Sequence, residues 1–108
     1  MILENLNIYL RKKLNMVELL DLPTSEKKLL VEMYRKGVVS ARTQSVYSKF
    51  SFYIAVSELK ALNLIEPNGI FKGGEPKEWR LTEEGKKLAR LIIRMDKFLR
   101  EIREMTKK

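Results

Sequence analysis

The sequence predicts a mainly α-helical fold with a small β ribbon, which places the chain in the α+β class. Two observations support this: apolar residues recur at helical spacing along most of the chain, and two strand-like segments, residues 64–66 and 78–81, flank a stretch of turn residues. The length of 108 residues fits one domain that buries a core without disulfide bonds or metal. We therefore expect a single domain over residues 1–108.

Residues 1–21 are expected to form an amphipathic helix, because apolar residues recur there every three or four positions. This apolar stripe consists of Leu3, Leu6, Leu10, Leu14 and Val17. Pro23 ends the helix. A second helix is predicted after Thr24, which suits an N-cap, and Gly37 is its C-terminal stop.

The middle of the chain is expected to hold a short strand and two helices. The strand covers residues 38–40, and the first helix is short, over residues 42–49. The apolar residues that indicate this short helix are Val46, Tyr47 and Phe50. Ser51 then caps a helix over residues 52–62, and Asn63 tolerates the left-handed turn that follows. The inward residues of that helix are Phe52, Val56, Leu59 and Leu62.

Two turns lie between the ribbon strands, residues 67–69 and 72–76, and either of them suits the tip of the ribbon. Thr82 is an N-cap for a long last helix, over residues 83–106. Its apolar residues follow the heptad spacing of a coiled coil. They are Leu88, Leu91, Met95, Phe98, Ile102 and Met105, widened by Ile92 and Leu99.

The stretch from Leu62 to Glu66, together with Trp79 to Gly85, resembles the wing of winged helix-turn-helix regulators of the MarR and PadR kind. The resemblance covers the middle two-thirds of the chain. It implies a winged helix-turn-helix core over residues 24–82, with residues 38–40 as a third strand and residues 52–62 as the recognition helix. It also implies that the long N- and C-terminal helices build a two-fold dimer. The dimerisation residues would be Leu6, Leu10, Val17, Leu88, Leu91, Met95, Phe98 and Ile102.

Charge and composition narrow the function. Lys and Arg number 22 against 14 Asp and Glu, so the net charge of +8 favours a polyanionic partner. Cysteine and histidine are absent, which removes thiol nucleophiles, the usual zinc ligand sets and the commonest general base. We therefore expect neither an enzyme nor a cofactor or metal. No apolar run is long enough to cross a membrane and the first ten residues lack a basic leader, so the expected location is cytoplasmic, with the nucleoid.

The candidate DNA-binding residues fall into three groups. The outward face of helix 52–62 presents Tyr53, Ser57 and Lys60, which can bond phosphates or base edges, while Ile54 can touch a thymine methyl group. Glu58 opposes phosphate, and the helix has no Arg for reading guanine. A donor cluster precedes this face and suits a phosphate clamp: Arg42, Thr43, Gln44, Ser45, Ser48, Lys49 and Ser51. The wing adds the cations Lys72, Lys77 and Arg80.

These patterns favour a dimeric transcriptional regulator that prefers certain double-stranded DNA sequences, with the helix-turn-helix in the major groove and the basic wing on the backbone or minor groove. Trp79 is expected to belong to the core rather than to stack on bases. Two alternatives stay open: a low-specificity architectural or partition DNA-binding protein, and a winged helix that docks proteins without binding DNA.

Overall fold

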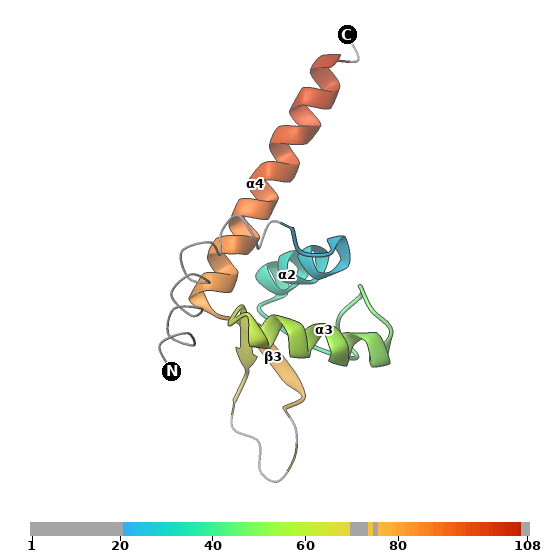
Figure 1. Ribbon diagram of the computed structural model, residues 1–108, viewed down its shortest axis with the longest axis vertical. Coiled ribbons are helices and arrows are strands. Elements are labelled where there is room, and N and C mark those ends of the chain that lie inside the picture. Colours follow the sequence, from blue (N-terminus) through green and yellow to red (C-terminus); the bar gives the residue numbers. More distant parts are fainter. Residues whose placement is uncertain (1–20, 70–73, 75, 107–108) are drawn as a thin grey trace, which may run out of the picture.

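The computed structural model describes residues 21–69, 74 and 76–106, so the predicted N-terminal helix, with Leu6, Leu10 and Val17, and the wing residue Lys72 lie outside the described residues. The described elements are α2 (Thr24–Lys36), β1 (Val38–Ser40), α3 (Lys49–Ala61), β2 (Ile65–Pro67), β3 (Glu78–Leu81) and α4 (Glu83–Thr106). Figure 1 shows α2 and α3 on one side of the base of α4, with the ribbon projecting below α3.

The strands form one antiparallel sheet in the order β1-β3-β2, with Val39 opposite Trp79 and Ile65 opposite Leu81. This confirms the predicted ribbon and the third strand beside it. Trp79 is buried, as the sequence analysis expected. The buried apolar residues come from every described element and form one core. They are Leu29, Leu30, Met33, Val39, Phe52, Ala55, Val56, Leu59, Leu64, Ile65, Trp79, Leu81, Leu88, Ala89 and Ile92.

The start of α2 differs from the prediction. Thr24 is already the first helical residue and Pro23 occupies the N-cap position, so the expectation that Thr24 caps α2 is wrong. Pro23 has extended backbone, and its carbonyl accepts the N–H of Lys27 at 3.1 Å. The end agrees with the prediction, because Gly37 adopts a φ of +89° and donates its N–H to the carbonyl of Met33 at 2.7 Å.

The predicted helix over residues 42–49 is also wrong, since the chain forms turns from residue 41 to residue 48. The helix that follows, α3, begins at Lys49, three residues before the predicted start. Its N-cap is Ser48 rather than Ser51, because the Ser48 side chain accepts the N–H of Ser51. The local apolar spacing failed as a signal because Phe50 belongs to α3, whereas Val46 and Tyr47 pack against the core from a turn.

A compact set of bonds closes the base of the ribbon. Asn63 has a φ of +60°, the left-handed conformation that the sequence predicted. Thr82 donates its hydroxyl to the carbonyl of Asn63 at 2.7 Å and accepts the N–H of Gly85 at 3.1 Å, which confirms it as the cap of α4. A Cβ atom on Gly85 would overlap the backbone carbonyl of Leu64, so this position needs glycine.

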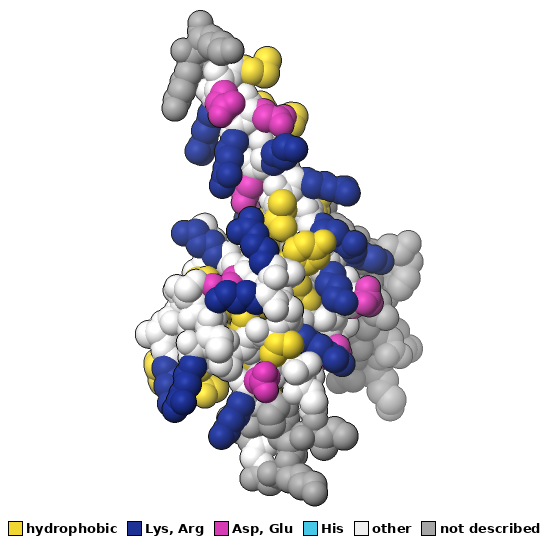
Figure 2. Space-filling view, turned by 180° about the vertical axis from the view of Figure 1, so that it is seen from behind, with side chains coloured by type: hydrophobic (Ala, Val, Ile, Leu, Met, Phe, Trp, Pro, Cys, Tyr) yellow, Lys and Arg dark blue, Asp and Glu magenta, His cyan; other side chains and the backbone are white. Residues whose placement is uncertain are grey.

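The long helix α4 has two unlike halves. Leu88, Ala89 and Ile92 near its start are buried in the core. Beyond them the helix leaves the body of the molecule (Figure 1), and its large apolar side chains are between 41 and 75 % exposed. These exposed residues are Met95, Phe98, Leu99, Ile102 and Met105. Figure 2 shows Lys and Arg side chains on both sides of this half.

Candidate nucleic-acid interface

The outward face of α3 agrees with the sequence prediction. Tyr53 and Ile54 are 43 and 50 % exposed, and Ser57 and Lys60 are also exposed. The opposite face is fully used by the core, through Phe52, Ala55, Val56 and Leu59. The outward side chains lie outside the core, although the Tyr53 ring meets Phe52 edge-on, and their exposed surface is available to a partner.

Phe50 is a surface residue that the sequence reasoning missed. It was grouped with Val46 and Tyr47 as one side of a short helix, but it lies in the first turn of α3 and is 77 % exposed. It precedes Ile54 by four residues, so both lie on the same side of the helix. The signal that could have located it is Ser48, an N-cap residue three positions before another serine.

The buried side chain of Gln44 organises the turns that precede α3. Its carbonyl oxygen accepts the N–H groups of Val46 and Tyr47 at 2.9 and 2.8 Å. Its amide donates to the carbonyls of Tyr47 at 2.6 Å and Ala41 at 3.3 Å. These bonds replace the helical bonds that residues 42–49 would otherwise make, and they direct this amide inward.

Ser45 and Tyr47 tie the same turns to α2. The N–H and hydroxyl of Ser45 both donate to the carboxylate of Glu32, and the hydroxyl of Tyr47 donates to Ser25 at 2.8 Å. Burial alone would raise the pKa of Glu32, but the bonds from Ser45 and the charge of Lys36 hold this pKa below its usual value. The donor cluster contains no acidic residue of its own, but the carboxylate of Glu32 on α2 lies beside it and accepts two of its hydrogen bonds.

Two further members of the cluster also make internal bonds. The Thr43 hydroxyl accepts the N–H of Ser40 at 2.8 Å, and Ser48 caps α3. By contrast, Arg42 and Lys49 are exposed, and among the described residues neither forms an ion pair or a side-chain hydrogen bond. The structure thus separates residues that shape the turns from cations that face solvent.

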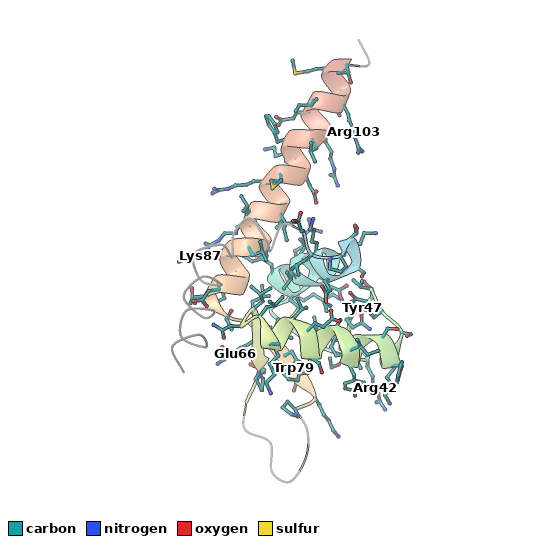
Figure 3. All side chains as sticks on the ribbon, viewed as in Figure 1. Arg42, Tyr47, Glu66, Trp79, Lys87 and Arg103 are labelled. Carbon is teal, nitrogen blue, oxygen red and sulfur yellow. The ribbon has the colours of Figure 1, made fainter. Side chains whose placement is uncertain are left out.

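Among the described residues, three cations lie in or beside the ribbon, one of them at the end of α3. The Lys60 ammonium lies 5.8 Å from the centre of the Trp79 ring, a cation–π distance that draws it toward β3. Arg80 pairs with Glu66 at 2.9 Å, whereas Lys77 is exposed. In Figure 3, Arg42 and Trp79 lie along the lower edge of α3, toward opposite ends of the helix. Positive charge therefore borders the face of α3 at both ends.

Glu58, the acid on α3, is close to a buried carboxyl group of α2. Glu26 is only 3 % exposed, and burial followed by the hydrogen bond and negative charge of Glu58 raises its pKa to about 7. Among the described residues, Oε1 of Glu26 has no hydrogen-bond partner. Glu58 therefore lies near α2, although its own side chain is exposed.

Within the described ranges, no cluster of three Cys, His, Asp or Glu side chains is arranged to hold a metal ion. In the same part of the chain, no helix is long and apolar enough to cross a membrane.

No family model matches the chain, and no curated protein matches it. Among solved structures, a double mutant of ZitR from Lactococcus lactis in its apo form superposes with a TM-score of 0.58 at 16 % sequence identity. The match covers 99 % of this chain and 82 % of the ZitR chain. At this identity the likeness shows the fold alone. Together with the helices and the three-stranded sheet described above, it identifies the fold of this chain as a winged helix.

Proposed function

We propose that this protein binds double-stranded DNA through α3 and acts as a dimeric transcriptional regulator of the MarR or PadR kind. The observation that carries the proposal is the outward face of α3, which has no core role and is bordered by cations at both ends. A helix of this width fits the major groove, and cations beside it meet the phosphates along the groove edges.

The residues have two kinds of role in this proposal. Arg42 and Lys49 neutralise phosphates near the start of α3, and Lys60, Lys77 and Arg80 do so near the ribbon. Tyr53 and Ser57 reach base edges. The remaining members of the donor cluster hold the turns and so position Arg42 and Lys49; they are Thr43, Gln44, Ser45, Ser48 and Ser51.

The dimer is part of the proposal. The outer half of α4 exposes its heptad residues, and an exposed apolar stripe of this length is costly in a monomer. A second copy that packs the same stripe would cover it. A two-fold dimer would then place two copies of α3 on half-sites about one helical turn apart.

The dimer can be tested without disturbing the core. Phe98→Glu combined with Ile102→Glu changes only exposed residues, whereas Leu91 is partly buried and would affect folding as well. We expect this double variant to sediment as a monomer with unchanged circular dichroism, while the control Arg94→Glu, also exposed on α4, stays dimeric. A monomeric wild type would contradict the proposed dimer.

DNA binding is tested by titrating the protein against a random duplex at two salt concentrations, followed by fluorescence anisotropy. We expect binding that weakens with salt, with a slope of about 0.9 for each phosphate neutralised. Absence of binding at low salt would refute the proposal and leave protein docking as the function. The exposed Phe50 and Ile54 favour that second candidate, because apolar side chains at the centre of a surface are common in protein interfaces.

Sequence specificity distinguishes a transcriptional regulator from the alternative, an architectural DNA-binding protein. Because α3 contains no Arg, Asn or Gln, bidentate base reading by these residues is not available from this helix. An affinity that is equal for selected and random duplexes would favour a low-specificity architectural or partition protein over a regulator.

A further inference from the structure

The outward edge of α3 is apolar, which is unusual for a helix that meets nucleic acid. Positions 50, 54, 57 and 61 lie within about 60° of one another around the helix, since each residue advances by about 100°. The residues at these positions are Phe50, Ile54, Ser57 and Ala61, and all four are exposed. We call these four residues the α3 edge.

Ser57 is the polar residue of this edge, and the larger polar side chains of the outward surface of α3 lie on its two flanks. Tyr53 and Lys60 are on one flank, and the Lys60 ammonium is drawn to the Trp79 ring. Glu58 is on the other flank, where it acts on the buried Glu26. Hydrogen-bonding groups for base reading are therefore sparse along the edge, and its largest exposed groups are the Phe50 ring and the Ile54 side chain.

One feature of the major groove matches an apolar edge. Thymine alone among the four bases of DNA presents a methyl group there, and Phe and other apolar side chains contact it. Resting on the proposed DNA binding, we propose that Phe50 and Ile54 recognise thymine methyl groups, so that the protein prefers A·T pairs beneath the first two turns of α3.

Charge favours DNA over a second copy of this chain as the occupant of the edge. Arg42 and Lys49 lie at its beginning, and Lys60, beside Trp79 of the ribbon, lies near its end, where phosphate rows would run beside it. A second copy carries a net charge of +8 and would bring like charges together. A polyanion with methyl groups in its groove satisfies both the cations and the apolar edge.

The test compares duplexes that differ only in the thymine methyl group. The probes are an alternating A·T duplex of about 20 base pairs, which spans two half-sites, and the same duplex with dU in place of every dT. Anisotropy titrations at one salt concentration give the ratio of the two affinities. We expect the wild type to bind the dT duplex more tightly, by about fourfold for each methyl group buried.

The variant for the test is Phe50→Ala combined with Ile54→Ala, which removes exposed side chains and leaves the core intact. We expect its dT and dU affinities to be equal and close to the wild-type affinity for the dU duplex. The control Tyr34→Ala removes an exposed aromatic residue of α2 and should keep the wild-type ratio.

The outcomes separate the inference from the function on which it rests. A wild type that binds both duplexes equally would overturn methyl recognition and leave DNA binding intact. A preference that survives in the double variant would overturn the assignment to Phe50 and Ile54. Loss of self-association in the double variant with an unchanged ratio would make the edge a contact between copies. Failure to bind either duplex would refute the proposed function, and the inference with it.

Discussion

The base of the ribbon and the turns before α3 are held together in different ways. At the ribbon base, Asn63 and Gly85 act through their backbone, and the Thr82 hydroxyl bonds Asn63 across the hairpin and Gly85 in α4. In residues 41–48, side chains hold the backbone: Gln44 bonds its own segment, and Ser45 bonds Glu32 of α2. The first arrangement depends on residue type at fixed positions, whereas the second depends on buried side-chain bonds, of which those of Ser45 need a partner on α2.

The recognisable sequence motif lies in the first of these two regions. The residues that resemble the family pattern, Leu62 to Glu66 and Trp79 to Gly85, build the hairpin and the start of α4. They specify the fold, and among them Arg80 is the exposed contact residue of the proposed site. The candidate contacts Arg42 and Phe50 lie in or beside the other region, where the sequence signal is weaker.

The largest effect is expected at Gly85. In Gly85→Ala, the added Cβ overlaps the carbonyl of Leu64, so α4 must shift away from β2. We expect the free energy of unfolding to fall by about 3 kcal/mol, measured by urea denaturation. In the control Gly74→Ala the added Cβ meets nothing within 4 Å among the described residues, and this variant should unfold like the wild type. Equal stability of the two variants would show that the close approach at Gly85 is not required.

The second effect concerns the carboxyl group buried between α2 and α3. Because the pKa of Glu26 is raised from 4.5 to about 7, the folded state keeps a proton that the unfolded state releases. Stability is therefore lost as the pH rises from about 4.5 to about 7, by up to about 3 kcal/mol. Glu26→Gln should abolish this decline and be more stable than the wild type at pH 8, in urea denaturation across pH.

The matched control for this titration is Glu84→Gln, which removes an exposed carboxyl group and should keep the wild-type pH dependence. If Glu26→Gln and the wild type lose stability in parallel between pH 5 and pH 8, the ionisation of Glu26 is not coupled to folding.

The third effect tests whether Gln44 shapes its turn. Gln44→Ala leaves the N–H groups of Val46 and Tyr47 without their acceptor, and we expect a loss of about 2 kcal/mol in unfolding free energy. Arg42→Ala, in the same turns, removes an exposed side chain and should leave stability within about 0.5 kcal/mol of the wild type. A stable Gln44→Ala variant would contradict the structural role assigned to this amide.

These cases show why the sequence predicted some parts of the fold and not others. The sequence correctly predicted the ribbon, the third strand, the helix stop at Gly37, the left-handed Asn63 and the N-cap Thr82. These predictions succeeded because turn residues and caps act mainly on backbone a few positions away. The helix over residues 42–49 was wrong because Gln44 competes for the backbone. Periodicity contains no information about such a bond, nor about Glu32, thirteen residues away from Ser45.

The sequence likewise predicted the exposure of some candidate site residues and missed that of others. The exposure of Tyr53, Ser57 and Lys60 followed from the helical spacing of the core residues opposite them. The exposure of Phe50 did not, because it depends on where α3 begins, and this in turn depends on Ser48 as the N-cap. The closeness of Glu58 to Glu26 was not visible either, because the two residues are distant in sequence.

The central claim is that DNA binds to the surface formed by α3 and the turns before it. Its most direct test is the affinity of Arg42→Ala and Lys49→Ala for a random duplex, measured by anisotropy at several salt concentrations after circular dichroism confirms the fold. The control is Lys87→Ala, an exposed cation at the base of α4, away from Arg42 in Figure 3.

Each of the two variants should bind about tenfold more weakly than the wild type, as expected for one lost charge-assisted bond of about 1.5 kcal/mol. Each should also lower the salt slope by about one, while Lys87→Ala behaves as the wild type. Wild-type affinity and slope in both Arg42→Ala and Lys49→Ala would contradict DNA binding through this surface.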